Sequence, residues 1–166
     1  MGSKDWPEIA RQLAKSLAAE LPELELNFAP SSLGRLEAEV LRRFTDPAQL
    51  SAPEARPFVD GVAAYFGEVM CGLGGWGWST AWEWGHSSPW EGDDRPEVNA
   101  WKDLHYAISR PLPGFVPWDV IADAVRDRSG SEFLDRYEDW DSAAMEMVDE
   151  LASAEDDEDE DEDEDA

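Results

Sequence analysis

The chain has 166 residues, 42% of them hydrophobic, which suits one domain with a single core. Its 39 acidic residues against 13 basic residues give a formal net charge of −26. A surface this acidic repels nucleic-acid phosphates and anionic lipids, and it attracts basic proteins and cations. We therefore expect no direct binding to nucleic acids or membranes, and a basic protein as the partner. Solubility is a second interpretation of the same charge.

The acidic residues are unevenly distributed along the chain. Residues 155–165 are an unbroken run of eleven acids, and the other 28 acids and 13 bases leave residues 1–154 with a net charge of −15. Adjacent like charges repel one another and bury no apolar surface. We therefore expect one domain over residues 1–153 and a disordered acidic tail over residues 154–166, which steers the chain toward basic surfaces.

The sequence contains no run of about 18 apolar residues, the length that would cross a membrane. Its first helix begins among charged residues rather than with the apolar segment of a signal peptide. These features predict a cytoplasmic protein. Cys71 is the only cysteine, so no disulfide forms within the chain, and we expect a small buried apolar side chain at this position.

Five segments have the apolar spacing of helices. The first covers residues 5–20 and ends before Pro22, and the second begins at Ser31 or Ser32 and continues to residue 44. The third follows residues 62–73 and stops at two glycines, and residues 117–128 and 133–151 predict the last two. We expect the exposed side of the second helix to carry Arg35, Glu37, Glu39, Arg42 and Arg43.

Three segments have the alternating pattern of strands. Apolar residues alternate over residues 24–28 and 104–108, and in the segment between them Trp76, Trp78, Thr80, Trp82 and Trp84 occupy every second position. We expect residues 104–108 to pair with the tryptophan strand. The order of elements predicts an α+β fold, in which a small antiparallel sheet is packed by about five helices.

The tryptophan strand has two interpretations. In the first, Trp76, Trp78, Trp82 and Trp84 form the inner face of the sheet and pack on the helix that carries Tyr65. In the second, the same side chains form an exposed platform that stacks on a sugar ring, a base or a cationic side chain. The first predicts a structural role and the second a binding site.

Glu68 lies on the otherwise apolar third helix and also has two interpretations. Its carboxylate either faces solvent or accepts a hydrogen bond from a tryptophan indole, or it is a buried general base. Paired with Glu83, it would resemble the two carboxylates of a glycosidase.

The sequence Tyr65-Phe66-Gly67-Glu68 near a helix end, followed by Gly74-Gly75-Trp76-Gly77-Trp78, forms a helix-to-strand pattern. It resembles a pattern in small bacterial proteins, some of them immunity-like proteins found with toxins, over residues 58–84. The resemblance implies an α+β accessory or immunity-type protein without enzymatic activity, and it assigns no functional residue.

Motifs for cofactors or metals are not found. His86 and His105 lack the spacing of metal ligands, and no phosphate-binding, dinucleotide-binding or nucleophile motif occurs, so we expect no cofactor and no catalytic residue. The preferred hypothesis is a noncatalytic acidic protein that binds a basic protein, as an immunity protein, inhibitor or chaperone does. One alternative is a module that binds a sugar or nucleotide on the tryptophan strand. The other is a small enzyme centred on Glu68.

Overall fold

The computed structural model describes residues 6–72, 76–79, 97–100 and 114–158. These contain helices α1 (Trp6–Glu20), α2 (Ser31–Arg43), α3 (Arg56–Cys71), α4 (Pro117–Asp127) and α5 (Glu132–Glu158), and strands β1 (Trp76–Ser79), β2 (Glu97–Ala100) and β3 (Gly114–Phe115). Two short 3₁₀ helices, Pro22–Leu24 and Pro47–Ser51, connect α1 to α2 and α2 to α3. The five α-helices lie where the apolar spacing predicts them.

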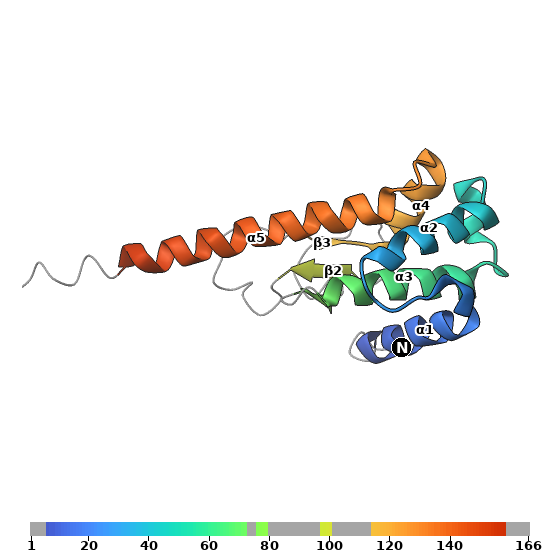
Figure 1. The fold of residues 1–166 in the computed structure, drawn as a ribbon, viewed down its shortest axis with the longest axis horizontal. Helices are drawn as coiled ribbons and strands as arrows, with labels where there is room; N and C mark the ends of the chain where they lie inside the picture. The colour runs from blue at the N-terminus through green and yellow to red at the C-terminus, as the bar shows by residue number, and fades with distance from the viewer. Residues whose placement is uncertain (1–5, 73–75, 80–96, 101–113, 159–166) are drawn as a thin grey trace, which may run out of the picture.

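The α+β class predicted from the sequence is wrong, because the described residues form a predominantly helical fold. The helices have 15, 13, 16, 11 and 27 residues, whereas the strands have four, four and two. Strands this short do not form a layer that five helices can cover. The helices pack on one another instead, and the strands lie against α3 near its C-terminal end (Figure 1).

The strands pair in the order β1-β2-β3, and both pairs are antiparallel. Trp76 is opposite Ala100 and Trp78 is opposite Val98. The partner expected for the tryptophan strand, residues 104–108, lies outside the described residues. β2 lies beside β1 instead. Its only large apolar residue is Val98, so the alternation of apolar and polar residues in its sequence is too short for a strand to be predicted from it.

The strand predicted over residues 24–28 is wrong. Residues 22–24 form a 3₁₀ helix, and Glu25 and Phe28 have φ angles of 48° and 61°, which are left-handed and incompatible with an extended strand. The backbone N–H of Phe28 donates to the hydroxyl of Tyr65 at 2.8 Å, and the ring of Phe28 stacks on the ring of Tyr65. A tertiary contact with α3 therefore overrides the local alternation.

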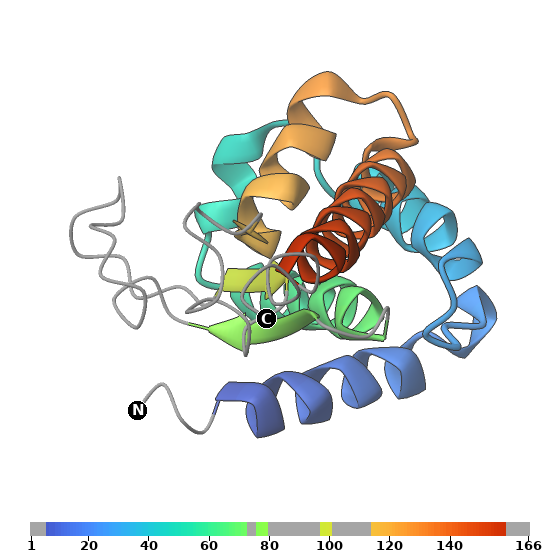
Figure 2. The same ribbon diagram turned by 90° about the vertical axis from the view of Figure 1, so that its left-hand side faces the viewer.

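Helix α3 is the centre of the core. Every residue from Gly61 to Gly67 is buried, so the helix is enclosed on all sides, as its apolar composition requires. Figure 2 shows α1 on one side of α3 and α2, α4 and α5 on the other. Small residues make the contact with α1 close, because Ala10 and Ala14 are fully buried and a Cβ on Gly61 would lie 3.4 Å from Cδ1 of Leu17.

Helix α5 continues to Glu158, so the domain boundary predicted at residue 153 falls inside a helix. The first four acids of the eleven-residue run are therefore helical. In Figure 1 the C-terminal part of α5 projects beyond the other helices. Residues 159–166 of the predicted tail lie outside the described residues.

The exposed side predicted for α2 is wrong at Glu37, which is fully buried, and at Glu39, which is 9% exposed. The Glu37 carboxylate accepts the backbone N–H of Glu132 at 3.1 Å and of Phe133 at 2.9 Å. Those two amides begin α5 and have no partner within that helix. Glu37 thus joins α2 to the N-terminal end of α5, where the helix dipole also favours a negative charge.

Glu39 accepts hydrogen bonds from Arg42 at 2.6 and 2.7 Å and from Arg43 at 2.6 Å. These bonds hold the pKa of the Glu39 carboxyl at about 2, below its ordinary value of 4.5. At Glu37 burial has the larger effect and raises the pKa, and the two backbone N–H donors offset part of the rise. Two acids on one helix are therefore shifted in opposite directions.

Replacing each acid with glutamine should reveal the two shifts through the pH dependence of stability. A raised folded-state pKa stabilises the fold below pH 4.5, and that stabilisation is lost as the pH rises. The stability difference between the wild type and Glu37→Gln should therefore shrink as the pH rises above 4.5. The difference between the wild type and Glu39→Gln should shrink as the pH falls from 4.5 toward 2. Urea unfolding at a series of pH values measures both, and differences that change in the same direction would contradict the assignment.

Candidate functional site

Trp78 has the interior position that the first interpretation of the tryptophan strand predicts. The side chain is 5% exposed and packs on α3 at Gly67. A Cβ at Gly67 would overlap Cη2 and Cζ2 of the indole, so only glycine leaves room for the ring. Trp78 therefore belongs to the core, and it offers no open face to a ligand.

Glu68 follows that glycine and holds the indole in place. Its Oε1 accepts the Nε1–H of Trp78 at 2.8 Å, and its Oε2 lies 3.9 Å from Nε of Arg11. The side chain of Glu68 is 16% exposed. The interpretation of Glu68 as an acceptor for an indole N–H is confirmed. Glu68 is not among the residues that line the two cavities described below.

Two tryptophans that are remote from Trp78 in sequence form a cluster with its ring. Trp6, at the start of α1, has its ring centroid 5.7 Å from that of Trp78 and 5.7 Å from that of Trp118, at the start of α4. Nε1 of Trp118 donates to Oδ1 of Asp60 on α3 at 2.9 Å. Sequence reasoning missed this arrangement, because a single tryptophan in the first turn of each helix gives no sign that the two meet. We call Trp6, Trp78 and Trp118 the tryptophan cluster.

Of the other predicted site residues, only Trp76 lies among the described residues. Trp76 lies in β1, and its side chain is not described. Trp82, Glu83 and Trp84 lie outside the described residues, and so does any pairing of Glu68 with Glu83. Cys71 is partly buried against the core, and burial together with the nearby Glu68 raises its pKa to about 12. Its thiol is therefore protonated at neutral pH and unreactive as a nucleophile.

A groove of about 330 Å³ lies between α1 and the first turns of α3. Its apolar lining comes from Leu13 and Leu17 of α1, from Leu21 immediately after α1, and from Phe58 of α3. The first three have the i, i+4, i+8 spacing of one helix face. We call this feature the α1/α3 groove.

The polar lining of the α1/α3 groove is mostly acidic. Glu20 and Glu54 are exposed, and Asp60 is partly buried beside them. Arg43 is the one cation among the lining residues; its Nε donates to Glu39 at 2.6 Å, and its guanidinium carbon lies 4.0 Å from the ring centroid of Phe58. Arg43, Glu54 and Phe58 also line a second cavity of about 380 Å³. Sequence reasoning missed the groove because its residues come from four separate segments, which are α1, the C-terminal end of α2, the connector between α2 and α3, and α3 itself.

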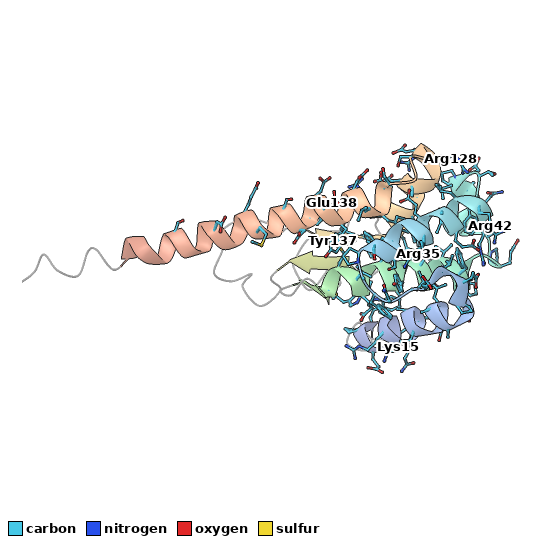
Figure 3. The ribbon with its side chains drawn as sticks, viewed as in Figure 1. Lys15, Arg35, Arg42, Arg128, Tyr137 and Glu138 are labelled. Atoms are coloured by element: carbon cyan, nitrogen blue, oxygen red, sulfur yellow. The ribbon has the colours of Figure 1, made fainter. Side chains whose placement is uncertain are left out.

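The arginines of the described residues are mostly engaged within the protein. Arg35 donates to the carbonyls of Leu24 and Glu25, and Arg128 donates to those of Leu41 and Phe44. Figure 3 labels Arg35, Arg42 and Arg128, which come from α2 and the end of α4. Five further arginines form ion pairs with carboxylates instead, and these are Arg11, Arg42, Arg43, Arg126 and Arg136.

Among the described residues, no group of three or more histidine, cysteine, aspartate or glutamate side chains is arranged to hold a metal ion. A search of the described helices for one long and apolar enough to span a membrane also finds none.

The geometry defines a class: an acidic helical protein with a tryptophan cluster centred on the buried Trp78 and with an acid-lined groove. No protein-family model matches the chain, and comparisons with curated proteins and with solved structures likewise give no match. The resemblance to immunity-like proteins therefore stays a prediction.

Substituting alanine at Gly67 tests the tight contact with Trp78. The added Cβ overlaps the indole, so we expect Gly67→Ala to lower the free energy of unfolding by about 1–3 kcal/mol. Gly34 of α2 is the matched control, since a Cβ there meets nothing within 4 Å. Gly34→Ala should raise stability by about 0.5–1 kcal/mol through helix propensity. Denaturant unfolding measures both, and equal effects of the two substitutions would refute the contact.

Proposed function

We propose that this chain is a noncatalytic binding protein whose partner is a basic protein. The observation that carries the proposal is that most of its lysines and arginines already form hydrogen bonds or ion pairs within the protein. Of the nine described lysines and arginines, only Lys15 and Arg56 lack a hydrogen bond or ion pair with a described residue. The paired arginines neutralise only their own partners, so few cations are left for the other surface carboxylates.

Helix α5 illustrates the resulting surface. It contains twelve acids and one base, Arg136, which is already paired with Glu132 at 2.7 Å and Asp123 at 3.2 Å. Glu138, Asp139, Asp141, Glu146 and Asp149 are all exposed along it. A field of one sign raises the local concentration of oppositely charged partners and increases their association rate.

The two alternatives have less support. A sugar or nucleotide platform requires open indole faces, but Trp78 is buried and hydrogen-bonded. An enzyme centred on Glu68 requires a free carboxylate, but Glu68 is bonded to the indole of Trp78 and lines neither the α1/α3 groove nor the second cavity. Neutralisation, inhibition or chaperoning of a basic protein in the cytoplasm is the role we propose, in the manner of an immunity protein.

Affinity capture from the source cytoplasm tests this proposal, with the full chain and a chain ending at residue 154 as baits. Both should recover the same basic protein in a stoichiometric amount, identified by mass spectrometry. With that protein purified, the shorter chain should associate about tenfold more slowly at low salt and show a smaller salt dependence, because the acids of the run steer approach.

The dissociation rate should be the same for both chains, because the run makes no specific contact. Recovery of no basic protein, together with a rise in melting temperature on adding a sugar or nucleotide, would overturn the proposal in favour of a ligand-binding module.

A further inference from the structure

The α1/α3 groove combines an apolar interior with carboxylates at its edge. Leu17 and Leu21 are 3% and 8% exposed, whereas Glu20 and Glu54 are exposed. Its volume of about 330 Å³ is at the low end for ligand pockets, which are roughly 300–1,000 Å³. A groove of this size suits one or two inserted side chains better than a cofactor.

The charge of the groove selects the sign of its occupant. Glu20 and Glu54 form no ion pair with a described residue, whereas Arg43 is already bonded to Glu39 and stacked on Phe58. Lys15 and Arg56, the described cations without a partner, are not among the lining residues. A bound segment therefore meets two exposed carboxylates whose charges the groove itself does not neutralise.

The groove lies between helices that pack on one another. Gly61 of α3 faces Leu17 of α1, and the hydrogen bond from Trp118 to Asp60 joins α3 to α4. A site on packed helices does not have to be ordered when a partner binds, which reduces the entropic cost of association.

We propose that the α1/α3 groove is the docking site for a basic segment of the protein partner. The segment inserts an apolar side chain between Leu13, Leu17 and Phe58, and its lysines or arginines pair with Glu20 and Glu54. The proposal rests on the proposed function and adds to it the place and the chemistry of the contact. Apolar anchors beside complementary charges are the usual form of helix-in-groove recognition.

The test uses the full chain and a fluorescently labelled amphipathic peptide of leucine and lysine. The double variant Glu20→Lys/Glu54→Lys should weaken binding by at least about tenfold, since it places like charges opposite the peptide lysines. The matched control Glu138→Lys/Asp141→Lys changes the net charge by the same amount on α5. It should weaken binding by less than about threefold, because no described residue of α5 lines the groove and salt screens exposed charges. Figure 3 shows Glu138 on α5 and Lys15 on α1 on different sides of the molecule.

The apolar half of the contact has its own variants. Ser16 is exposed and lines the groove, so Ser16→Phe should fill the groove and weaken binding by at least about tenfold without a change in melting temperature. Ser142→Phe, at an exposed position on α5, should bind as the wild type does. A peptide with alanine in place of leucine should bind the wild type at least about tenfold less tightly.

The outcomes separate the groove from the proposed function. Equal losses in the two lysine variants would mean that only the overall field attracts the peptide, and unchanged binding in Glu20→Lys/Glu54→Lys would place the contact elsewhere. Either result contradicts the proposal that the groove is the docking site, but neither contradicts the proposed function. Failure of the wild type to bind both the peptide and any basic protein overturns both.

Discussion

The repulsion between its own carboxylates is the constraint under which this chain folds. The fold meets it by placing charge where the backbone has an opposite partial charge. Glu37 lies at the N-terminal end of α5, where its carboxylate accepts two unpaired N–H groups. Arg128 lies at the C-terminal end of α2, where it donates to the carbonyls of Leu41 and Phe44. Each of these contacts also joins segments far apart in sequence.

The arginine that donates these two bonds also has an unusual backbone conformation. Arg128 has a φ of 53°, a left-handed angle that costs a side-chain-bearing residue about 1 kcal/mol or more. In this conformation it ends α4 and its N–H donates to the carbonyl of Ala124 at 2.9 Å. The two carbonyl contacts of its guanidinium offset that cost, and glycine would lose both of them. The guanidinium of Arg128 thus joins α4 to α2 through backbone carbonyls rather than through a carboxylate.

The positions of the helices could be predicted from the sequence, because their apolar spacing is local information. The fold class could not, since it depends on how long the strands become. Alternating tryptophans predicted a strand over residues 76–84, of which the structure describes Trp76–Ser79 as β1, and the partner strand β2 has only one large apolar residue. The alternation at residues 24–28 gave way to a contact with Tyr65 that is 37 residues away in sequence.

The candidate site could be predicted only where a residue contacts its near neighbours in sequence. Glu68 is an acid on an apolar helix next to a tryptophan-rich segment, and its bond to an indole follows from that placement. The burial of Glu37 was not predictable, because the amides that it binds are 95 and 96 residues away. The groove was likewise hidden, since Glu20, Glu54 and Asp60 come together only through the packing of α1 on α3.

Helix α1, which supplies much of the groove lining, and the acidic helix α5 lie on opposite sides of α3 (Figure 2), and this separation divides their roles. Exposed charges are screened over about 8–10 Å at physiological ionic strength. A 27-residue helix is about 40 Å long, and the acids in the C-terminal part of α5 project with it beyond the other helices (Figure 1). They therefore add little to a contact once it has formed, but they enlarge the region over which a basic partner is attracted. Specificity in the proposed complex thus comes from the helical body, and the acidic C-terminal segment contributes to the rate of encounter.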